Sequence, residues 1–260
     1  MTKPLKDIIS ETNDIASRHS EYSDLTVITV AAHDRDSGLL HYMIRSVFKF
    51  TDLPPRIIIS DNGHNGPLAE MYDDNKYISV VKNAELHKNA SMSHGSGLNK
   101  AFALVETDRT AIIESDCVVL NKGWDDTADC LMSGAVKTQF LDKFGFRAYF
   151  PLFLVFSTSA MKKDGDIDFM PESGGKSKVG RDTGWQIYKK VSEEEVSPLE
   201  VVKCTDEKCM YFDRKFVPNA LELWKDGIPI VAHVGRGSKV LRRGPHIFKM
   251  WKPILEKILR

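Results

Sequence analysis

The feature that most constrains this chain is the alternation of short apolar runs with amphipathic segments in its first half. The runs are rich in β-branched residues, which is typical of buried strands, and the segments between them carry apolar residues at helical spacing. The expected strands cover 25–32, 56–60, 77–81 and 110–113, and the expected helices cover 39–50, 68–72 and 98–106. This alternation predicts an α/β fold with a mixed, mostly parallel sheet and helices on both faces.

Composition agrees with an ordinary globular protein of 260 residues, 42% hydrophobic and 28% charged, and excludes low-complexity disorder. The four cysteines do not make a disulfide scaffold, and Cys204 and Cys209 lack the second pair that a zinc knuckle needs. The N-terminus has no signal-peptide run, and no window approaches 18 consecutive apolar residues. We therefore expect a cytoplasmic protein with reduced thiols and no transmembrane segment.

The charge is balanced overall but unevenly distributed. Equal numbers of basic and acidic residues, 36 each, argue against an electrostatic grip of the whole protein on nucleic acid. The end of the chain is basic, however, and residues 241–260 have the pattern of a basic amphipathic helix with Ile247, Trp251, Ile254 and Ile258 on one face. Such a helix either packs on the domain or contacts an anionic surface, including a peripheral membrane surface.

Polar residues follow three of the expected strands at the points where they end. His33 and Arg35 follow the first strand, Asp61 follows the second, and Glu114 and Asp116 follow the strand at 110–113. Each of these residues alone could cap a helix or form a turn. Because ligands bind beyond the carboxyl ends of parallel strands, three such groups at one edge predict a binding site there.

Glu114 and Asp116 form an acid-x-acid pair, a pattern that occurs by chance in many proteins. The alternation of a strand directs both side chains to one side, where two carboxylates repel each other and lose hydration unless a cation joins them. A hard divalent metal ion prefers oxygen ligands and leaves room for substrate phosphates. The pair therefore indicates either a metal site or a solvated turn at the end of the strand.

Four blocks of the sequence, in order, resemble the family-2 glycosyltransferases of the GT-A fold. They are LTVITVAAHDR, SVFKFTDLPPRIIISDNG, NASMSHGSGLNKAF and RTAIIESDCVVLNKGW, and together they cover about residues 24–126. The resemblance implies a Rossmann-like half that binds a nucleotide sugar, with Mn²⁺ or Mg²⁺ at an Asp-x-Asp motif. Here Glu114 replaces the first aspartate of that motif, so Asp116 is the better candidate for direct coordination, with Glu114 beside it.

The resemblance also implies roles for individual residues of the donor site. His33 stands where the family often has an aromatic residue near the base, Asp61 where an aspartate meets the uracil imide, and Asn99 in a glycine-rich loop that helps to close the site. His233 is expected to complete the metal site. The loop after it offers backbone N–H groups and positive charge to the diphosphate. The remaining donor-binding residues predicted by the resemblance are Arg35, Glu114, Asp116, Arg236, Ser238 and Lys239.

The second half resembles the acceptor and catalytic half of the family. Asp182 stands at the Glu-Asp motif that opens a helix, expected here over 183–191, and is expected to take the proton of the acceptor hydroxyl. It could instead only cap that helix. Asp168 and Glu172 are rival bases, and Trp185 and Glu172 are expected to contact the acceptor.

The sequence thus predicts a single GT-A domain over 1–260, with a nucleotide-sugar half (24–126), an acceptor half (127–240) and the C-terminal helix (241–260). We expect a metal-dependent transfer from a UDP-sugar to a hydroxyl acceptor, with inversion, which the resemblance implies. A retaining transferase stays open, because His233 and Lys239 have a spacing seen in such enzymes. A sugar-nucleotide nucleotidyltransferase and a non-catalytic nucleotide-sugar-binding module are the alternatives of another class. The acceptor is open among a glycan, a lipid-linked sugar, a protein and a hydroxylated nucleic-acid base.

Overall fold

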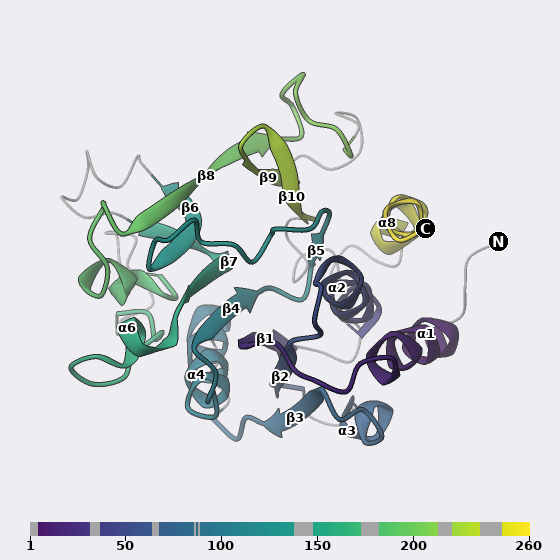
Figure 1. Ribbon diagram of the computed structural model, residues 1–260, viewed down its shortest axis with the longest axis horizontal. Coiled ribbons are helices and arrows are strands. Elements are labelled where there is room, and N and C mark those ends of the chain that lie inside the picture. The colour runs from purple at the N-terminus through teal and green to yellow at the C-terminus, as the bar shows by residue number, and fades with distance from the viewer. Residues whose placement is uncertain are drawn as a thin grey trace.

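A sheet of ten strands runs through the described part of the chain in this computed structural model (Figure 1). The strand order is β3-β2-β1-β4-β7-β6-β8-β9-β10-β5. The structure describes residues 5–31, 37–63, 68–85, 87, 89–137, 148–172, 182–212, 220–234 and 246–260. None of the helices in these ranges is both long enough and apolar enough to cross a membrane.

The first half has the parallel sheet that the sequence predicts. Its strands are β1 (Leu25–Ala31), β2 (Arg56–Asp61), β3 (Ile78–Lys82) and β4 (Arg109–Ile113), and β1 pairs in parallel with both β2 and β4. The helices are α1 (Leu5–Ser17), α2 (Ser37–Phe50), α3 (Leu68–Tyr72) and α4 (Ala90–Phe102). Because all four strands are parallel, their carboxyl ends lie at one edge of the sheet, which we call the carboxyl edge.

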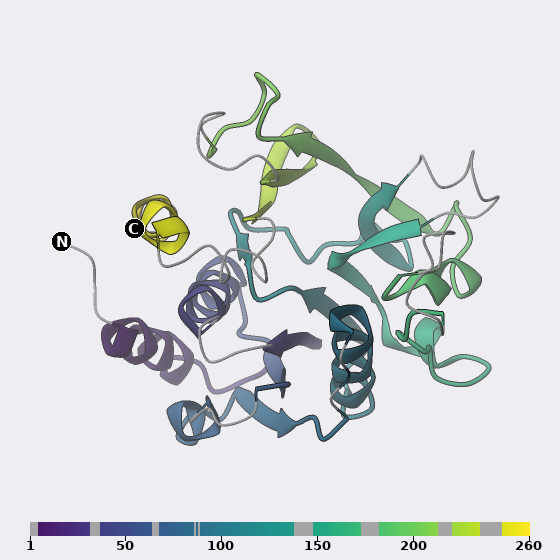
Figure 2. The same ribbon diagram turned by 180° about the vertical axis from the view of Figure 1, so that it is seen from behind.

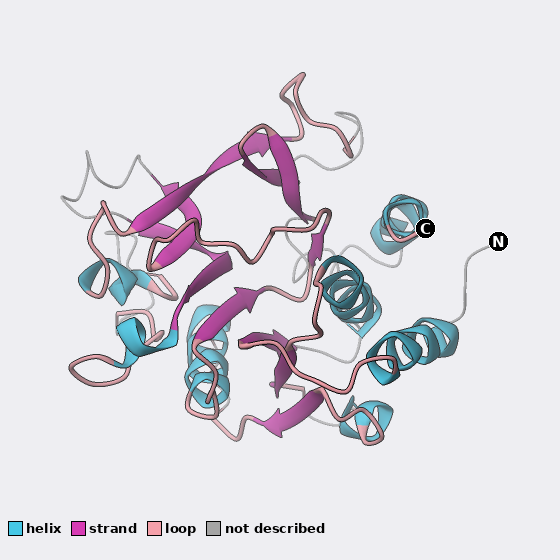
Figure 3. Cartoon of the chain, viewed as in Figure 1, coloured by secondary structure: helices cyan, strands magenta, loops and turns pink. Residues whose placement is uncertain are grey.

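The second half is built mainly from antiparallel strands and loops (Figure 3). Its strands are β5 (Cys117–Val119), β6 (Met132–Lys137), β7 (Ala148–Ser157), β8 (Val196–Lys203), β9 (Leu221–Lys225) and β10 (Ile228–His233). Its helical elements are α6 (Thr158–Lys162), the 3₁₀ helix η1 (Trp185–Lys189) and α8 (His246–Ile258). β7 joins the two halves, because it pairs antiparallel with both β4 and β6.

Helices cover both faces of the parallel strands, as predicted (Figures 1 and 2). All seven residues of β1 are buried, which is expected of a strand covered on both faces. Val27 lies in one apolar cluster with Met43 and Val47 of α2, and Ile28 lies in a second cluster with Phe102 of α4. Each fully buried side chain of this size contributes about 1.5–3 kcal/mol of hydrophobic stabilisation.

The course of α4 differs from the sequence-based expectation. The glycine-rich loop that the resemblance implies up to Asn99 lies inside α4, and the helix expected over 98–106 covers Ala90–Phe102. The helix starts early because Asn89 caps it, with its side chain accepting a hydrogen bond from the N–H of Ser91. Its glycines allow close packing: a Cβ at Gly97 would lie 3.0 Å from Cγ1 of Val30, and one at Gly95 would lie 2.8 Å from the carbonyl oxygen of Phe169.

The C-terminal helix α8 packs on the domain. Trp251, Leu255 and Leu259 are buried, and Trp251 packs edge-on against Phe212 with ring centroids 4.6 Å apart. Of the face expected from the sequence, Trp251 is buried in this cluster, and Ile254 and Ile258 are partly buried against it. The side chain of Ile247 lies outside the described residues. The predicted contact of this helix with an anionic surface stays a prediction.

The substitution Gly95→Ala tests the close packing of α4. In an open helix this change would stabilise the protein by about 1 kcal/mol. Here the new Cβ meets backbone, so we expect a loss of about 1–3 kcal/mol in the free energy of unfolding, measured by urea titration. Lys100→Ala, at an exposed position of the same helix, is the control and should change stability by less than about 0.5 kcal/mol. A stabilised Gly95→Ala protein would contradict the packing.

A second prediction concerns His41, a buried residue of α2 whose Nδ1 is hydrogen-bonded to the hydroxyl of Tyr72 in α3. Burial lowers the pKa of His41 to about 4. This value lies below that of the unfolded chain, about 6.5. The contribution of neutral His41 to the free energy of unfolding is therefore complete above pH 6.5 and is lost as the pH falls toward 4. We expect a loss of about 3 kcal/mol over this window. Urea titrations at several pH values should show a shallower acid slope for His41→Gln, and parallel slopes would contradict the assignment.

Candidate metal centre and its surroundings

The candidate site is built where the chain leaves β4. The strand ends at Ile113, and the N–H of Cys117 donates to the carbonyl of Glu114 at 2.9 Å, which closes a tight turn. The chain then enters β5, which pairs with β10 and brings His233 opposite Cys117. The N–H of Val234 donates to the carbonyl of Asp116 at 3.0 Å. Residues more than a hundred positions apart in sequence are thereby held side by side.

Three side chains predicted from the sequence converge at this turn. Nε2 of His233 lies 3.3 Å from Oδ1 of Asp116 and 3.5 Å from Oε2 of Glu114. The side chains of His233 and Asp116 are only 13% and 11% exposed, whereas Glu114 is 28% exposed. The cluster is therefore largely buried at the carboxyl edge, and Glu114 is its most exposed member.

The electrostatics of this cluster call for positive charge. Burial by itself lowers the pKa of His233, but the carboxylates of Asp116 and Glu114 outweigh it and raise that pKa to about 10. A proton on the imidazole balances part of the negative charge of the two carboxylates when no other cation is present. A divalent ion in the same position would balance both carboxylates.

The donor set fits Mn²⁺ or Mg²⁺. Carboxylates suit both ions, and the imidazole favours Mn²⁺ over Mg²⁺, which prefers oxygen ligands. Sγ of Cys117 also lies within 4.8 Å of the ligand atoms of Asp116 and His233. The thiol donates to the carbonyl of Leu152 at 3.4 Å, and burial raises its pKa well above the ordinary value, so it stays protonated and is a poor ligand.

A buried polar network lies at the carboxyl ends of β2 and β3, at the same edge of the sheet as this centre. Asn62 donates to the carbonyl of Ser93 at 2.6 Å and accepts from Asn83 at 2.9 Å, and Asn83 also donates to the hydroxyl of Ser96 at 2.8 Å. This network fastens α4 to the sheet. This network was not predicted. The available indication was an asparagine directly after each of two neighbouring strands.

Asp61 lies beside this network and keeps one carboxylate oxygen available. Its Oδ1 accepts a hydrogen bond from the N–H of Gly63 at 2.7 Å. Within the described residues, no hydrogen bond is made to Oδ2 of Asp61. The half-buried side chain of Asp61 is thus oriented at the carboxyl edge by Gly63, and its Oδ2 has no hydrogen-bond partner among the described residues.

Asn99 connects α4 to the second half of the chain. Its Nδ2 donates to Asp168 at 2.7 Å, and its Oδ1 accepts from the N–H of Phe169 at 2.8 Å. Both ends of the amide are therefore used within the protein, and its expected role in donor binding stays a prediction. Asp168 also accepts from the N–H of Met170, so two donors hold this carboxylate.

Asp182 lies exposed at the start of a segment that is fastened to α4. The hydroxyl of Thr183 donates to the carbonyl of Ser91 at 2.9 Å, and the N–H of Gly184 donates to the carbonyl of Phe169 at 3.0 Å. Since Ser91 is in the first turn of α4, this segment approaches the carboxyl edge. The helix expected over 183–191 is the shorter η1, with Gly184 before it at φ +74°.

The predicted acceptor residues differ in their surroundings. Trp185 is half-buried, with the ring of Tyr188 at a centroid distance of 6.1 Å and the ammonium of Lys189 at 4.5 Å from its ring. Glu172 is exposed. Five further predicted donor residues lie outside the described residues, namely His33, Arg35, Arg236, Ser238 and Lys239.

No protein-family model matches the chain, and no curated protein matches it either. Among solved structures, the chain is similar to the galactosyltransferase LgtC in complex with donor and acceptor sugar analogues, with 15% identity over 51% of this chain and a TM-score of 0.37. It is similar to S. aureus TarS 1–349, with 13% identity over 68% and a TM-score of 0.48. It is also similar to the mannosyltransferase PcManGT from Pyrobaculum calidifontis in complex with GDP-Man and Mn²⁺, with 11% identity over 63% and a TM-score of 0.42.

The matched regions span 58%, 58% and 59% of the lengths of those three chains. All three TM-scores lie below 0.5.

The metal centre predicts a defined pattern of Mn²⁺ affinities. Asp116→Asn and His233→Gln should each weaken Mn²⁺ binding by at least roughly tenfold, the smallest loss usual for an outer-shell partner of a metal. Glu114→Gln should weaken it less, because Glu114 is more exposed and lies farther from Nε2 of His233. Isothermal titration calorimetry measures these affinities. Asp73→Asn, at an exposed position after α3, is the control. If all four variants bound Mn²⁺ with equal affinity, the ion would not bind at this site.

Proposed function

We propose that this chain is a metal-dependent glycosyltransferase of the GT-A fold that uses a nucleotide-sugar donor. The observation that carries the proposal is the convergence of Glu114, Asp116 and His233 at the carboxyl edge of a parallel sheet. The sequence blocks that resemble family-2 glycosyltransferases place their Asp-x-Asp motif at these acidic residues. The carboxyl edge is also where α/β sheets bind nucleotides.

The donor that we propose is a UDP-sugar. The oxygen Oδ2 of Asp61 makes no hydrogen bond within the described residues, and Oδ1 is held by the N–H of Gly63. A carboxylate held in this way accepts the imide N–H of uracil, which is the role that the resemblance implies for Asp61. Guanine also offers a ring N–H, so GDP-sugars are the comparison that tests the choice of base.

The diphosphate of the donor would lie at the metal centre. Asp116 and His233 would hold the divalent ion, with Glu114 beside them. The bound ion would supply positive charge for the diphosphate leaving group, an effect worth several kcal/mol. His233 is held in place by its strand, because β10 pairs with β5 up to this residue, so it contributes a ligand of fixed position.

Asp182 is the residue that we propose as the general base. In the transfer, the acceptor oxygen forms a bond to the anomeric carbon while the bond from that carbon to the diphosphate oxygen breaks. The acceptor proton passes to the carboxylate of Asp182, and the diphosphate leaves with the electron pair of the broken bond. A single displacement of this kind inverts the anomeric configuration.

The contacts of the rival carboxylates support this choice. Asp168 is held by Asn99 and by the N–H of Met170, so it serves to position the 168–170 segment. Asp182 is exposed, and its Oδ1 accepts only from the N–H of its neighbour Thr183 within the described residues. We propose that Trp185, three residues further on, offers its ring to the apolar face of an acceptor sugar, and that the exposed Glu172 binds acceptor hydroxyls.

The substitution Asp182→Asn tests the base. We expect kcat to fall by roughly 10²–10⁴-fold, because the acceptor hydroxyl loses its proton acceptor, whereas donor affinity is unchanged. The assay measures the release of nucleoside diphosphate from UDP-sugars and GDP-sugars with Mn²⁺ and an acceptor panel. Asp166→Asn, an exposed neighbour of the rival Asp168, is the matched control and should retain full turnover. Full turnover by Asp182→Asn would reject this residue as the base.

The anomeric configuration of the product tests the stereochemistry. Proton NMR of the glycosylated acceptor should show an anomer opposite to that of the donor. The same anomer would establish retention and would require a different role for Asp182.

A further inference from the structure

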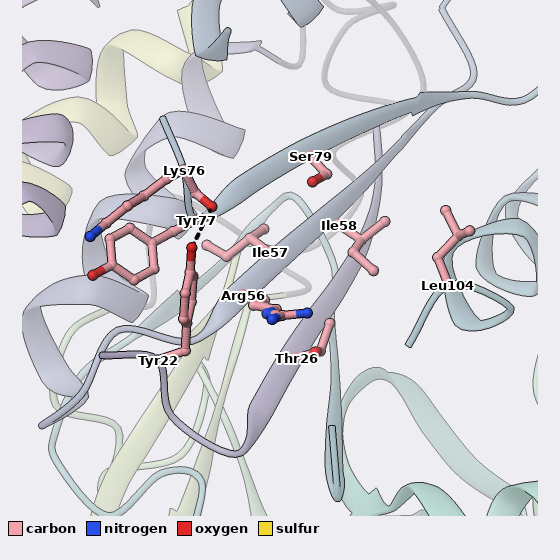
Figure 4. Close-up of a pocket in the computed structure, with 9 residues that line it drawn as sticks. All are labelled: Tyr22, Thr26, Arg56, Ile57, Ile58, Lys76, Tyr77, Ser79 and Leu104. Atoms are coloured by element: carbon pink, nitrogen blue, oxygen red, sulfur yellow. Dashed lines mark hydrogen bonds between the residues drawn. The ribbon is translucent and has the colours of Figure 1, made fainter. Parts of the chain in front are cut away.

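A pocket lies at the amino-terminal edge of the parallel strands, opposite the metal centre (Figure 4). We call it the amino-edge pocket. Its lining includes an arginine, hydroxyl side chains and apolar side chains from four separate segments, and those that matter here are Tyr22, Thr26, Arg56, Ile58, Ser79 and Leu104.

This pocket is separate from the proposed nucleotide site. Thr26 is the second residue of β1, Arg56 is the first residue of β2, and Leu104 follows the end of α4. β2 has six residues, and strands rise about 3.3 Å per residue, so the two edges lie about 20 Å apart. A nucleotide sugar bound at the carboxyl edge would not fill the amino-edge pocket.

The size of the pocket suits a small molecule. Its volume is about 210 Å³, which corresponds to roughly seven water molecules at about 30 Å³ each. The apolar part of the lining includes Ile58 and Leu104, which is 49% exposed. Figure 4 shows Leu104 on one side of the pocket and Tyr22 on the other, with Ile58 between them.

Arg56 is one of two basic residues that line the pocket, and its guanidinium contacts Tyr22 and Glu106. Its guanidinium carbon lies 4.9 Å from the ring centroid of Tyr22, and Nη1 donates to Glu106 at 3.3 Å. The side chains of Arg56 and Glu106 are 45% and 81% exposed, and ion pairs this exposed contribute little to stability. Within the described residues, no other hydrogen bond uses the guanidinium, so most of its five donors are free for a ligand.

Hydroxyl side chains line the same pocket as this guanidinium. The exposed side chain of Ser79 makes no hydrogen bond within the described residues, and the hydroxyl of Thr26 accepts from Thr107 at 2.7 Å. Lys76 also lines the pocket, but its ammonium points away from Arg56 (Figure 4), donates to the carbonyl of His19 at 3.0 Å and lies 4.9 Å from the ring centroid of Tyr77. A planar guanidinium with hydroxyl donors is the arrangement that binds several oxygen atoms of one phosphate group.

We propose that the amino-edge pocket binds a small phosphomonoester with a hydroxylated body, of the size of a sugar phosphate. Arg56 binds the phosphate oxygens, the hydroxyls of Ser79 and Thr26 bind the polar part, and Ile58 and Leu104 contact the apolar face of the body. The site is independent of the metal centre, so its ligand binds in the absence of divalent ions.

The test is a calorimetric and ¹⁵N NMR titration of the full chain with glucose 6-phosphate in EDTA. We expect saturable binding with shifts at the amides of Ser79 and Leu104, and no binding of glucose. Arg56→Gln should weaken binding at least tenfold. Arg260→Gln, which removes the same charge from the exposed end of α8, is the matched control and should bind normally. If Arg56→Gln does not fold, Ser79→Ala replaces it and should weaken binding at least threefold.

Four results would overturn the proposal. One is the absence of binding at millimolar glucose 6-phosphate. A second is a set of shifts confined to the carboxyl edge, around Asp61 and Glu114, and a third is full affinity in both Arg56→Gln and Ser79→Ala. The fourth is equal binding of gluconate, because a carboxylate would then satisfy the pocket as well as a phosphate.

Discussion

The mutual repulsion of Glu114 and Asp116 is the constraint on which this site depends. Two carboxylates at the end of a buried strand repel each other, and positive charge held close to them offsets this repulsion. The fold meets this requirement by a long-range pairing: β5 leaves the parallel sheet, pairs with β10 and places His233 at 3.3 Å from Asp116. The second half of the chain is thus needed to complete a centre that begins in the first half.

Around this centre, small side chains and amides allow the backbone elements to approach closely. Gly97 packs against Val30 and Asn62, and Asn62 is itself hydrogen-bonded to Ser93 and Asn83. A buried network with satisfied donors and acceptors fixes one arrangement of α4 on the sheet. This rigid attachment extends to the second half through Asn99 and Thr183. The exposed Asp182 is therefore carried on a segment that is anchored to the carboxyl edge.

The sequence predicted most of the first half because local pattern and tertiary burial agree there. The helix at 68–72 and the strand beginning at 56 lie where the apolar periodicity placed them. The glycine-rich loop that the resemblance implies up to Asn99 was wrong, because glycine has low helix propensity and its packing partners, Val30 and Phe169, are distant in sequence. The pairing of β7 with β4 and the amino-edge pocket were not predictable either, since both join segments that no local pattern relates.

The sequence by itself determined the α/β class, the parallel order of the first strands and the presence of acidic residues at the end of β4. These features follow from short-range periodicity, which each segment carries within itself. Only the tertiary structure decided which strand pairing brings the predicted His233 to those acids, that the Asn99 amide binds Asp168 and Phe169, and that Arg56 lines a pocket. The reason is physical: strand pairing and side-chain packing depend on the register between distant segments, and that register is set by the burial of the whole chain.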